Sequence, residues 1–383
     1  MMLRTVSFLL LLVSNFILAG GQVSWCAAAE PEDGVTEPVA QPSKTKPELS
    51  PELLGLRDRV RECLAYYYRR YENAAYRTPW EIMHTLIAFG VDTDVESRGR
   101  KVNAIGWLCW NRLCGGYRLF GAEDGKLEPR VGYGVQGHDG QFLSLLALSR
   151  VPADYTMKAN GHEFTVADLV EYEKQTCMPE TELSFKLLAL VHYLDSDASW
   201  KNQHGQDWDI PRLIREELAQ PVIGGTCGGT HRMMGFSYAV REREKRGEPF
   251  EGEWRRAKKY VDDYHEYTFK LQNPDGSFST NWFRRRGNRG GIEHRLNTTG
   301  HTLEWLALSL PDEELRDPRV VKSVDYLTRL LDNNRSYDWG FGARGHALHA
   351  LAIYDMRVFG SKPGRRPFLR PDQQPETDEV AAQ

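Results

Sequence analysis

The sequence has little net charge, little cysteine and no long apolar stretch beyond its first residues. Its 49 Lys and Arg residues are interspersed with 53 Asp and Glu residues, which leaves a formal net charge of −4. Proteins that bind nucleic acid carry a basic face, so this balance argues against a nucleic-acid partner. After residue 19 no apolar run approaches the roughly 20 residues that a membrane-spanning helix needs, which excludes a multispan membrane protein.

Cysteine is scarce, with six residues in the chain, and their spacing gives little support for a zinc module. Cys109 and Cys114 have no second close cysteine pair to complete a four-ligand site, so they are either a local pair or two buried thiols. One cysteine falls in the expected leader, and the odd number that remains leaves at least one thiol unpaired. Cys177 and Cys227 each precede a predicted helix, so a disulfide between them is a candidate.

Residues 1–29 have the pattern of a signal peptide. Arg4 supplies positive charge, residues 6–19 form a mostly apolar core, and residues 27–29 are three alanines at the expected cleavage site. Because the core is shorter than a membrane span, we expect cleavage and an exported protein, either periplasmic or extracellular. The alternative is an uncleaved amino terminus that tethers the protein to a membrane.

Two polar segments with repeated prolines flank the central part of the chain. Such segments cannot bury enough apolar surface to fold. We therefore expect a disordered tether at 30–50, one helical domain at 51–360 and a disordered tail at 361–383.

Two kinds of helical pattern alternate through the central domain. Long, charged, amphipathic segments such as 253–271 alternate with short segments such as 138–149, which are apolar nearly all round. This alternation predicts an all-α fold, an α/α toroid of about five to six hairpins with inner helices around an axis. The stretch 91–137, rich in Gly and aromatic residues, is expected to be an insertion over one mouth, either a loop or a small hairpin.

One phrase of the sequence is repeated. GHTLEWLAL, beginning at Gly300, returns as GHALHALAI, beginning at Gly345, and fainter copies begin at Gly137 and Thr230. Repetition of a helical unit indicates a repeat architecture. If the inner helices run parallel, the repeated histidines gather at one end of the axis, where free backbone N–H groups would also favour an anion.

This convergence gives the candidate site. Glu304 lies three residues after His301, and His349 lies three residues after His346, so each pair shares one helix face. Imidazole and carboxylate groups suit acid–base chemistry near neutral pH. The candidate catalytic residues are His138, His231, His301, Glu304, His346 and His349. The candidate substrate-binding residues are Tyr133, Arg232, Trp282 and Arg284.

Two other interpretations of the repeated histidines remain open. The Gly-His pair can be a packing feature that starts a helix, with each imidazole bonded to its own loop. Alternatively, His301, Glu304, His346 and His349 can supply nitrogen and oxygen ligands to a metal ion. No cofactor is otherwise indicated.

The segment QNPDGSF, from Gln272 to Phe278, closes a long amphipathic helix. Its pattern of Gln, three residues, Gly, one residue and an aromatic resembles the repeat motif of the squalene cyclase and protein prenyltransferase superfamily. That resemblance implies an α/α toroid. The cyclase acid motif Asp-x-Asp-Asp is absent, and the Asp, Cys and His zinc set of the prenyltransferases cannot be assigned, so the resemblance does not extend to those reactions.

The sequence leaves three functions to compare. The first is an exported enzyme that acts on an acidic or polyhydroxylated substrate, in the manner of a polysaccharide lyase or hydrolase, in a cavity lined by histidines. Its ligand would be a small molecule or a polysaccharide. The second is a non-catalytic toroid of the cell envelope that binds a ligand or protein. The third is a terpenoid cyclase-type enzyme, which would need a deep aromatic cavity.

Overall fold

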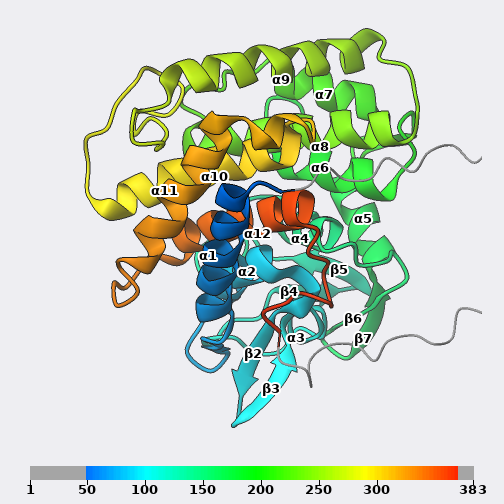
Figure 1. Cartoon of the computed structure of the whole chain (residues 1–383). Coiled ribbons are helices and arrows are strands. Elements are labelled where there is room, and N and C mark those ends of the chain that lie inside the picture. Colours follow the sequence, from blue (N-terminus) through cyan, green and yellow to red (C-terminus); the bar gives the residue numbers. More distant parts are fainter. Residues whose placement is uncertain (1–48, 370–383) are drawn as a thin grey trace, which may run out of the picture. The chain divides into compact units, whose positions relative to one another are not determined.

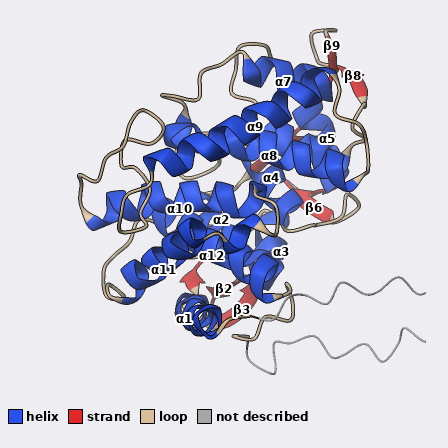
Figure 2. Cartoon of the chain, turned by 45° about the horizontal axis from the view of Figure 1, so that its top comes forward, coloured by secondary structure: helices blue, strands red, loops and turns tan. Residues whose placement is uncertain are grey.

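The computed structural model describes residues 49–369, and these contain both helices and strands (Figures 1 and 2). The prediction of an all-α toroid is wrong, because nine short strands in four small sheets accompany twelve α-helices within this range. One sheet has three strands, with β1 parallel and β3 antiparallel to β2. The strands are β1 (Glu72–Asn73), β2 (Asp94–Ser97), β3 (Arg100–Asn103), β4 (Phe120–Glu123), β5 (Lys126–Pro129), β6 (Thr156–Ala159), β7 (His162–Thr165), β8 (Ser199–Lys201) and β9 (Asp207–Asp209).

Tight turns explain why these strands form. Asp124-Gly125 joins β4 to β5 and Asn160-Gly161 joins β6 to β7, and all four residues have positive φ. Two successive residues with positive φ make the turn whose twist matches a hairpin, and Asn-Gly and Asp-Gly are its preferred sequences. The insertion that was expected at 91–137 therefore contains part of a small sheet and a whole hairpin.

Six helices pack side by side in a closed cycle. Each helix contacts the next along the chain, and the last, α12, returns to contact the first, α2 (Figure 1). The six are α2 (Pro79–Phe89), α4 (Gln141–Leu148), α6 (Ser184–Tyr193), α8 (Thr230–Lys245), α10 (Ile292–Ser309) and α12 (Phe341–Phe359). We call this arrangement the helix ring.

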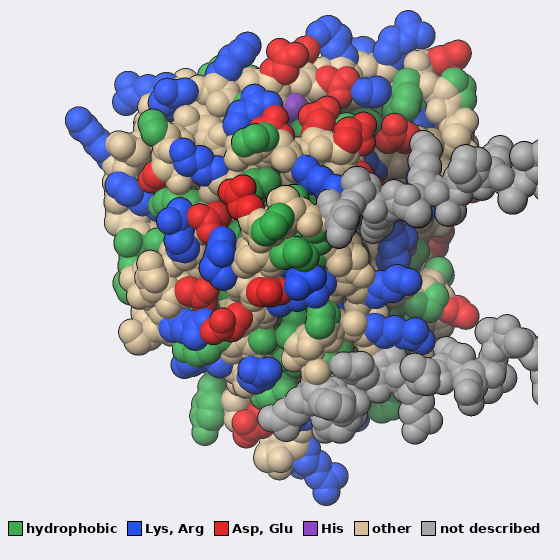
Figure 3. Space-filling model, in the orientation of Figure 1, with side chains coloured by type: hydrophobic (Ala, Val, Ile, Leu, Met, Phe, Trp, Pro, Cys, Tyr) green, Lys and Arg blue, Asp and Glu red, His purple; other side chains and the backbone are tan. Residues whose placement is uncertain are grey.

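The remaining helices pack behind the ring or beside the sheets. They are α1 (Pro51–Tyr68), α3 (Ala104–Cys109), α5 (Val166–Gln175), α7 (Ile210–Leu218), α9 (Gly252–Leu271) and α11 (Pro318–Asp332), with short 3-10 turns η1 (Gly90–Asp92), η2 (Thr226–Gly229) and η3 (Glu314–Arg316). Helix α9 contacts α7 and α8, and α11 contacts α1, α10 and α12. Acidic and basic side chains are interspersed on the face shown in Figure 3.

Local sequence signals start and stop several of these helices. Helix α2 begins with a capping box, in which the Thr78 side chain and Glu81 satisfy each other's backbone N–H groups, and Pro79 occupies the first turn. At the end of α9, the Gln272 side chain donates to the carbonyls of Gly276 and Arg319 at 3.2 and 2.9 Å. Gln272 thus ties the end of α9 to the turn that follows it.

The glycines of the repeated phrase lie within helices, which corrects the expected helix starts. Helices α10 and α12 begin at Ile292 and Phe341, well before Gly300 and Gly345. A Cβ atom on Gly345 would lie 2.2 Å from the carbonyl oxygen of His84 on α2, and one on Gly300 would lie 2.9 Å from the Cα of Ala347 on α12. Glycine therefore permits the close approach of neighbouring ring helices.

The carboxyl-terminal boundary also differs from the expectation. Residues Ser361 to Leu369, assigned to a disordered tail, pack on the domain: Phe368 and Leu369 are buried, and Arg366 forms an ion pair with Asp92 at 3.0 Å. The predicted signal peptide at 1–29, nearly all of the tether at 30–50 and residues 370–383 lie outside the described range. None of the helices within 49–369 has the length and hydropathy of a membrane span.

Candidate active site

Five histidines from five parts of the helix ring meet at its axis. The rings of His301 and His346 lie 3.8 Å apart between centroids, and His231 lies 5.6 and 5.5 Å from these two. His84 lies 5.5 Å from His346, and His138 lies 5.4 Å from His231. The structure thus brings together the four repeated histidines of the sequence and adds His84 from α2. We call these five side chains the histidine cluster.

Hydrogen bonds fix the orientation of four of these rings. The Nδ1 atoms of His84 and His301 lie 2.7 and 2.8 Å from backbone carbonyl oxygens of their own helices. The Nδ1 atoms of His138 and His346 each lie 2.8 Å from a carboxylate. A carbonyl oxygen can only accept, so Nδ1 carries the proton in His84 and His301, and Nε2 of the neutral ring is a free base.

Burial keeps the interior rings neutral. Desolvation lowers the pKa of His84 to about 3. Desolvation, together with the charges of neighbouring histidines, lowers the pKa of His231 and His301 well below the usual value. These imidazoles are therefore neutral at neutral pH, the state in which the ring nitrogen without a proton acts as a base or as a metal ligand.

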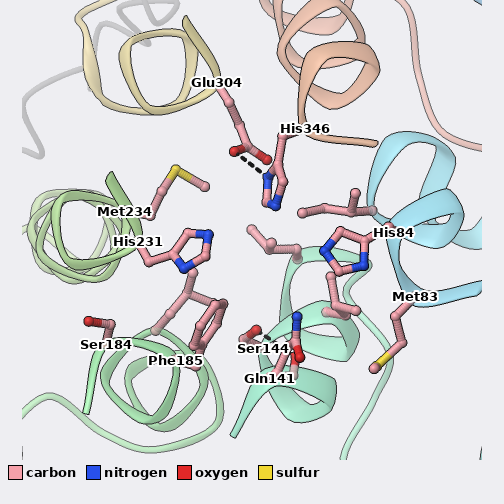
Figure 4. A pocket seen from close by; sticks show the side chains of 14 residues that line it. Met83, His84, Gln141, Ser144, Ser184, Phe185, His231, Met234, Glu304 and His346 are labelled. Atoms are coloured by element: carbon pink, nitrogen blue, oxygen red, sulfur yellow. Dashed lines mark hydrogen bonds and ion pairs between the residues drawn. The ribbon is translucent and has the colours of Figure 1, made fainter. Parts of the chain in front are cut away.

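Glu304 joins two histidines of α12. One oxygen lies 2.8 Å from Nδ1 of His346 (Figure 4), and the other lies 2.5 Å from Nδ1 of His349. Burial tends to raise the pKa of Glu304, but the charges and hydrogen bonds of these two histidines outweigh it and hold the pKa well below its usual range. The partners of Glu304 are thus on the adjacent helix, while its sequence neighbour His301 bonds to a backbone carbonyl.

The turn η2 positions Cys227 beside the cluster. Cys227, Gly228 and Gly229 have φ values of 48°, 69° and 93°, three successive residues in the left-handed region. A Cβ on Gly228 would lie 2.1 Å from the Trp282 ring. Left-handed backbone is costly for a non-glycine residue, and such strain gathers at functional sites.

A cysteine and two histidines form the one group of possible metal ligands found in the described residues. The ligand atoms of Cys227, His231 and His301 all lie within 4.8 Å of one another. Cys227 and Cys177 are both free thiols, so the disulfide suggested by the sequence is not formed. Cys177 instead lies buried and donates to the carbonyl of Glu173 at 3.2 Å.

The histidine cluster meets solvent at His138 and Glu182, whose side chains are 20% and 31% exposed. Desolvation tends to raise the pKa of Glu182, but the hydrogen bond and charge of His138 lower it overall. Deeper in the ring, His84, His231, His346 and Glu304 line a cavity of about 30 Å³ (Figure 4). That volume suits one or two water molecules or an ion, and it is far below the 300–1,000 Å³ of ordinary ligand pockets.

The four candidate substrate-binding residues lie in different settings. Tyr133 is 88% exposed and lines a groove of about 370 Å³ together with Trp80. Trp282 lies 5.8 Å from His301, and Arg284 is exposed in the loop that follows it. Arg232 is buried in an ion pair with Glu217 at 2.9 Å, so it holds the fold together and is not accessible to a substrate.

Comparisons of this chain with protein-family models, with curated proteins and with solved structures found no match. The resemblance to the squalene cyclase and prenyltransferase superfamily therefore remains a prediction from the sequence.

Proposed function

We propose that the protein is an exported enzyme that cleaves an acidic or polyhydroxylated substrate by acid–base chemistry at the open end of the histidine cluster. The observation that carries the proposal is the contact of His138 Nδ1 with Glu182 at 2.8 Å. A carboxylate that orients an imidazole leaves Nε2 available to exchange a proton with a bound substrate. Both side chains are partly exposed, so a substrate can reach them from solvent.

The reacting bond would lie outside the ring. The interior cavity of about 30 Å³ cannot hold a sugar ring, whereas the groove beside it measures about 370 Å³. Trp80, which lines this groove, packs on His84 with 4.0 Å between ring centroids. Aromatic side chains offer large apolar faces with polar edges, and Trp80 and Tyr133 are suited to the apolar faces of sugar rings.

The proposed step moves one proton at His138. Nε2 accepts a proton either from an attacking water, as in hydrolysis, or from a substrate carbon next to a carboxylate, as in elimination. Glu182 stabilises the imidazolium that forms. As the new bond forms, to the water oxygen in hydrolysis or between two substrate carbons in elimination, the bond to the leaving oxygen breaks, and that oxygen takes the proton from the His138 imidazolium. The two reactions are told apart by whether the product carries a new carbon–carbon double bond.

A panel of neutral and uronic-acid polysaccharides, assayed for new reducing ends and for unsaturated products, tests the proposal. General acid–base catalysis contributes about 10² to 10⁴-fold, so His138→Ala should lose activity on that scale. His265→Ala is the matched control, because His265 lies on α9 and bonds to Ser309 at 2.7 Å. Equal turnover by the His138→Ala variant and the wild type would remove the basis of the proposal.

A second candidate is a non-catalytic binding protein, and one observation favours it. The opposite end of the helix ring holds a pocket of about 460 Å³, with Tyr238 and Met356 in its wall and Arg150, Arg241 and Lys245 among its lining. Its size is that of an ordinary ligand pocket. Saturable binding of an anionic amphiphile, with no turnover of any polysaccharide, would favour this function over the enzyme.

A further inference from the structure

The geometry points to a metal site formed by Cys227, His231 and His301, and we infer that it takes a zinc-type transition-metal ion. This site does not depend on the acid–base proposal, because metal binding is measured without substrate. The three residues come from the turn η2 and the helices α8 and α10, so they are far apart in the chain and are joined only by the fold.

The spacing of the ligand atoms fits an ion after a small movement. Bonds of about 2.0–2.3 Å in a tetrahedral zinc site put its ligand atoms roughly 3.5 Å apart. The three atoms here lie within 4.8 Å of one another, so a contraction of at most about 1.3 Å from that limit to the tetrahedral spacing would close the site. His231 can supply that movement, because neither of its ring nitrogens is held by a hydrogen bond.

Unpartnered buried nitrogens support the inference independently. Nδ1 and Nε2 of His231 and Nε2 of His301 are buried without a hydrogen-bond partner among the described residues. A buried polar atom without a partner costs about 1–3 kcal/mol, and such an atom calls for an explanation such as a water or an ion. Two of these nitrogens belong to the same group of three ligands, which favours an ion shared between them.

The surroundings of His301 are those of a metal ligand. Its Nδ1 donates to the carbonyl of Asn297 at 2.8 Å, which fixes the tautomer with Nε2 unprotonated. Histidines that bind metals usually donate their other ring N–H to a carbonyl or carboxylate in this way. The same arrangement exists in His346, whose Nδ1 lies against Glu304 and whose ring lies 3.8 Å from His301.

The donor set selects the kind of metal. One sulfur and two imidazole nitrogens suit zinc and its neighbours, whereas Ca²⁺ and Mg²⁺ require oxygen ligands. Three protein ligands leave a fourth position for water, as in catalytic zinc sites, or for His346.

The backbone conformation of η2 positions Cys227. Gly229 must lack a side chain, since a Cβ there would lie 2.3 Å from the carbonyl oxygen of Val222. With Gly228 constrained by Trp282, the strained turn holds the Cys227 backbone in a left-handed conformation at the edge of the cluster. Strained backbone persists where it positions a functional group, and a thiol that binds a metal ion would be such a group.

The experiment uses the full chain, purified under reducing conditions, stripped with a chelator and reconstituted with Zn²⁺ or Co²⁺. We expect one ion per chain and a Co²⁺ spectrum with a thiolate-to-metal charge-transfer band. Cys227→Ser should abolish that band, and His231→Ala should weaken binding at least tenfold. Cys177→Ala is the matched control, since Cys177 is also a free thiol but lies outside the group of three ligands, and its replacement should leave both readouts unchanged.

Folded wild-type protein that binds neither ion, or a Co²⁺ spectrum without a thiolate band, would overturn the inference even if the variants fail to fold. Full polysaccharide cleavage by a wild-type protein that binds neither ion would overturn the metal inference while leaving the acid–base proposal intact. Stoichiometric zinc binding by a protein that cleaves no polysaccharide would support the metal site and count against the proposed enzymatic function.

Discussion

Replacement of Gly345 by alanine should destabilise the protein although alanine is the better helix former. Gly345 lies inside α12, where that helix crosses α2. A Cβ would lie 2.2 Å from the His84 carbonyl oxygen, 3.0 Å from the carbonyl carbon and 3.1 Å from the Cβ of the same residue. Ordinary contact begins at 3.4 Å, and the nearest atoms belong to the backbone, so the two helices must separate.

Two opposing effects set the size of the change. Overpacking a core costs about 1–3 kcal/mol, and the upper part of that range applies because a backbone cannot rotate away. The change from glycine to alanine within a helix returns about 1 kcal/mol. The free energy of unfolding of Gly345→Ala should therefore fall by about 2 kcal/mol, which corresponds to a decrease in Tm of roughly 4 °C.

Urea unfolding monitored by circular dichroism measures this difference, with Gly55→Ala as the matched control. Gly55 also lies inside a helix, α1, but its Cβ would meet only the flexible Arg59 side chain at 3.5 Å. Gly55→Ala should raise stability by up to about 1 kcal/mol. If both variants were stabilised equally, close helix packing would not be the reason for glycine in the repeated phrase.

Three further predictions concern residues outside the cluster or at its edge. Desolvation lowers the pKa of His265 to about 4 in the folded state, below about 6.5 unfolded, so its contribution is complete above pH 6.5 and is lost as pH falls to 4. Urea titrations at pH 7.5 and 4.5 measure how much free energy of unfolding each protein loses between these two pH values. The loss should be up to about 3 kcal/mol smaller in His265→Phe than in the wild type, and equal losses would refute this. Arg232→Met should cost about 3–5 kcal/mol in chemical unfolding, because Glu217 is left buried without its cation; wild-type stability would contradict that reasoning. Tyr133→Ala should raise KM for the cleaved polysaccharide while stability stays within about 0.5 kcal/mol of the wild type, and an unchanged KM would exclude Tyr133 from the groove's binding surface.

The sequence predicted the meeting of the histidines but misplaced the helices that carry them. The repeated phrase indicated that His138, His231, His301 and His346 share one location, and the structure places their rings together. The helices of His301 and His346 start well before the repeated phrase, because an isolated glycine such as Gly300 is treated as a break in a helical pattern. Only the packing of α10 against α12 explains why glycine is needed there.

Apart from a small hairpin considered as one alternative for 91–137, the strands were missed although short signals for them exist. Asp124-Gly125 and Asn160-Gly161 are typical two-residue hairpin turns, but each flanking strand has only four residues. Such segments are too short to outweigh the helical pattern around them, and the fold class was therefore assigned wrongly.

The sequence carries only partial signals for two site residues, Glu182 and Cys227. Glu182 comes shortly before a ring helix, as His138 does, and this shared position was an available signal. Cys227 was paired with Cys177 because both precede helices. Sequence spacing carries no information about which side chains η2 and α10 bring together, so its histidine neighbours could not be predicted.

A crystal structure with anomalous data at the zinc edge, from protein purified without chelator, tests the central claim most directly. The claim is that the end of the helix ring with His138 and Cys227 is a chemical centre. We predict an anomalous peak bonded to Cys227 Sγ and to His231 and His301 nitrogens at about 2.0–2.3 Å, with His138 and Glu182 still paired beside it. Absence of the peak, with those nitrogens hydrogen-bonded to protein groups or waters, would contradict the account.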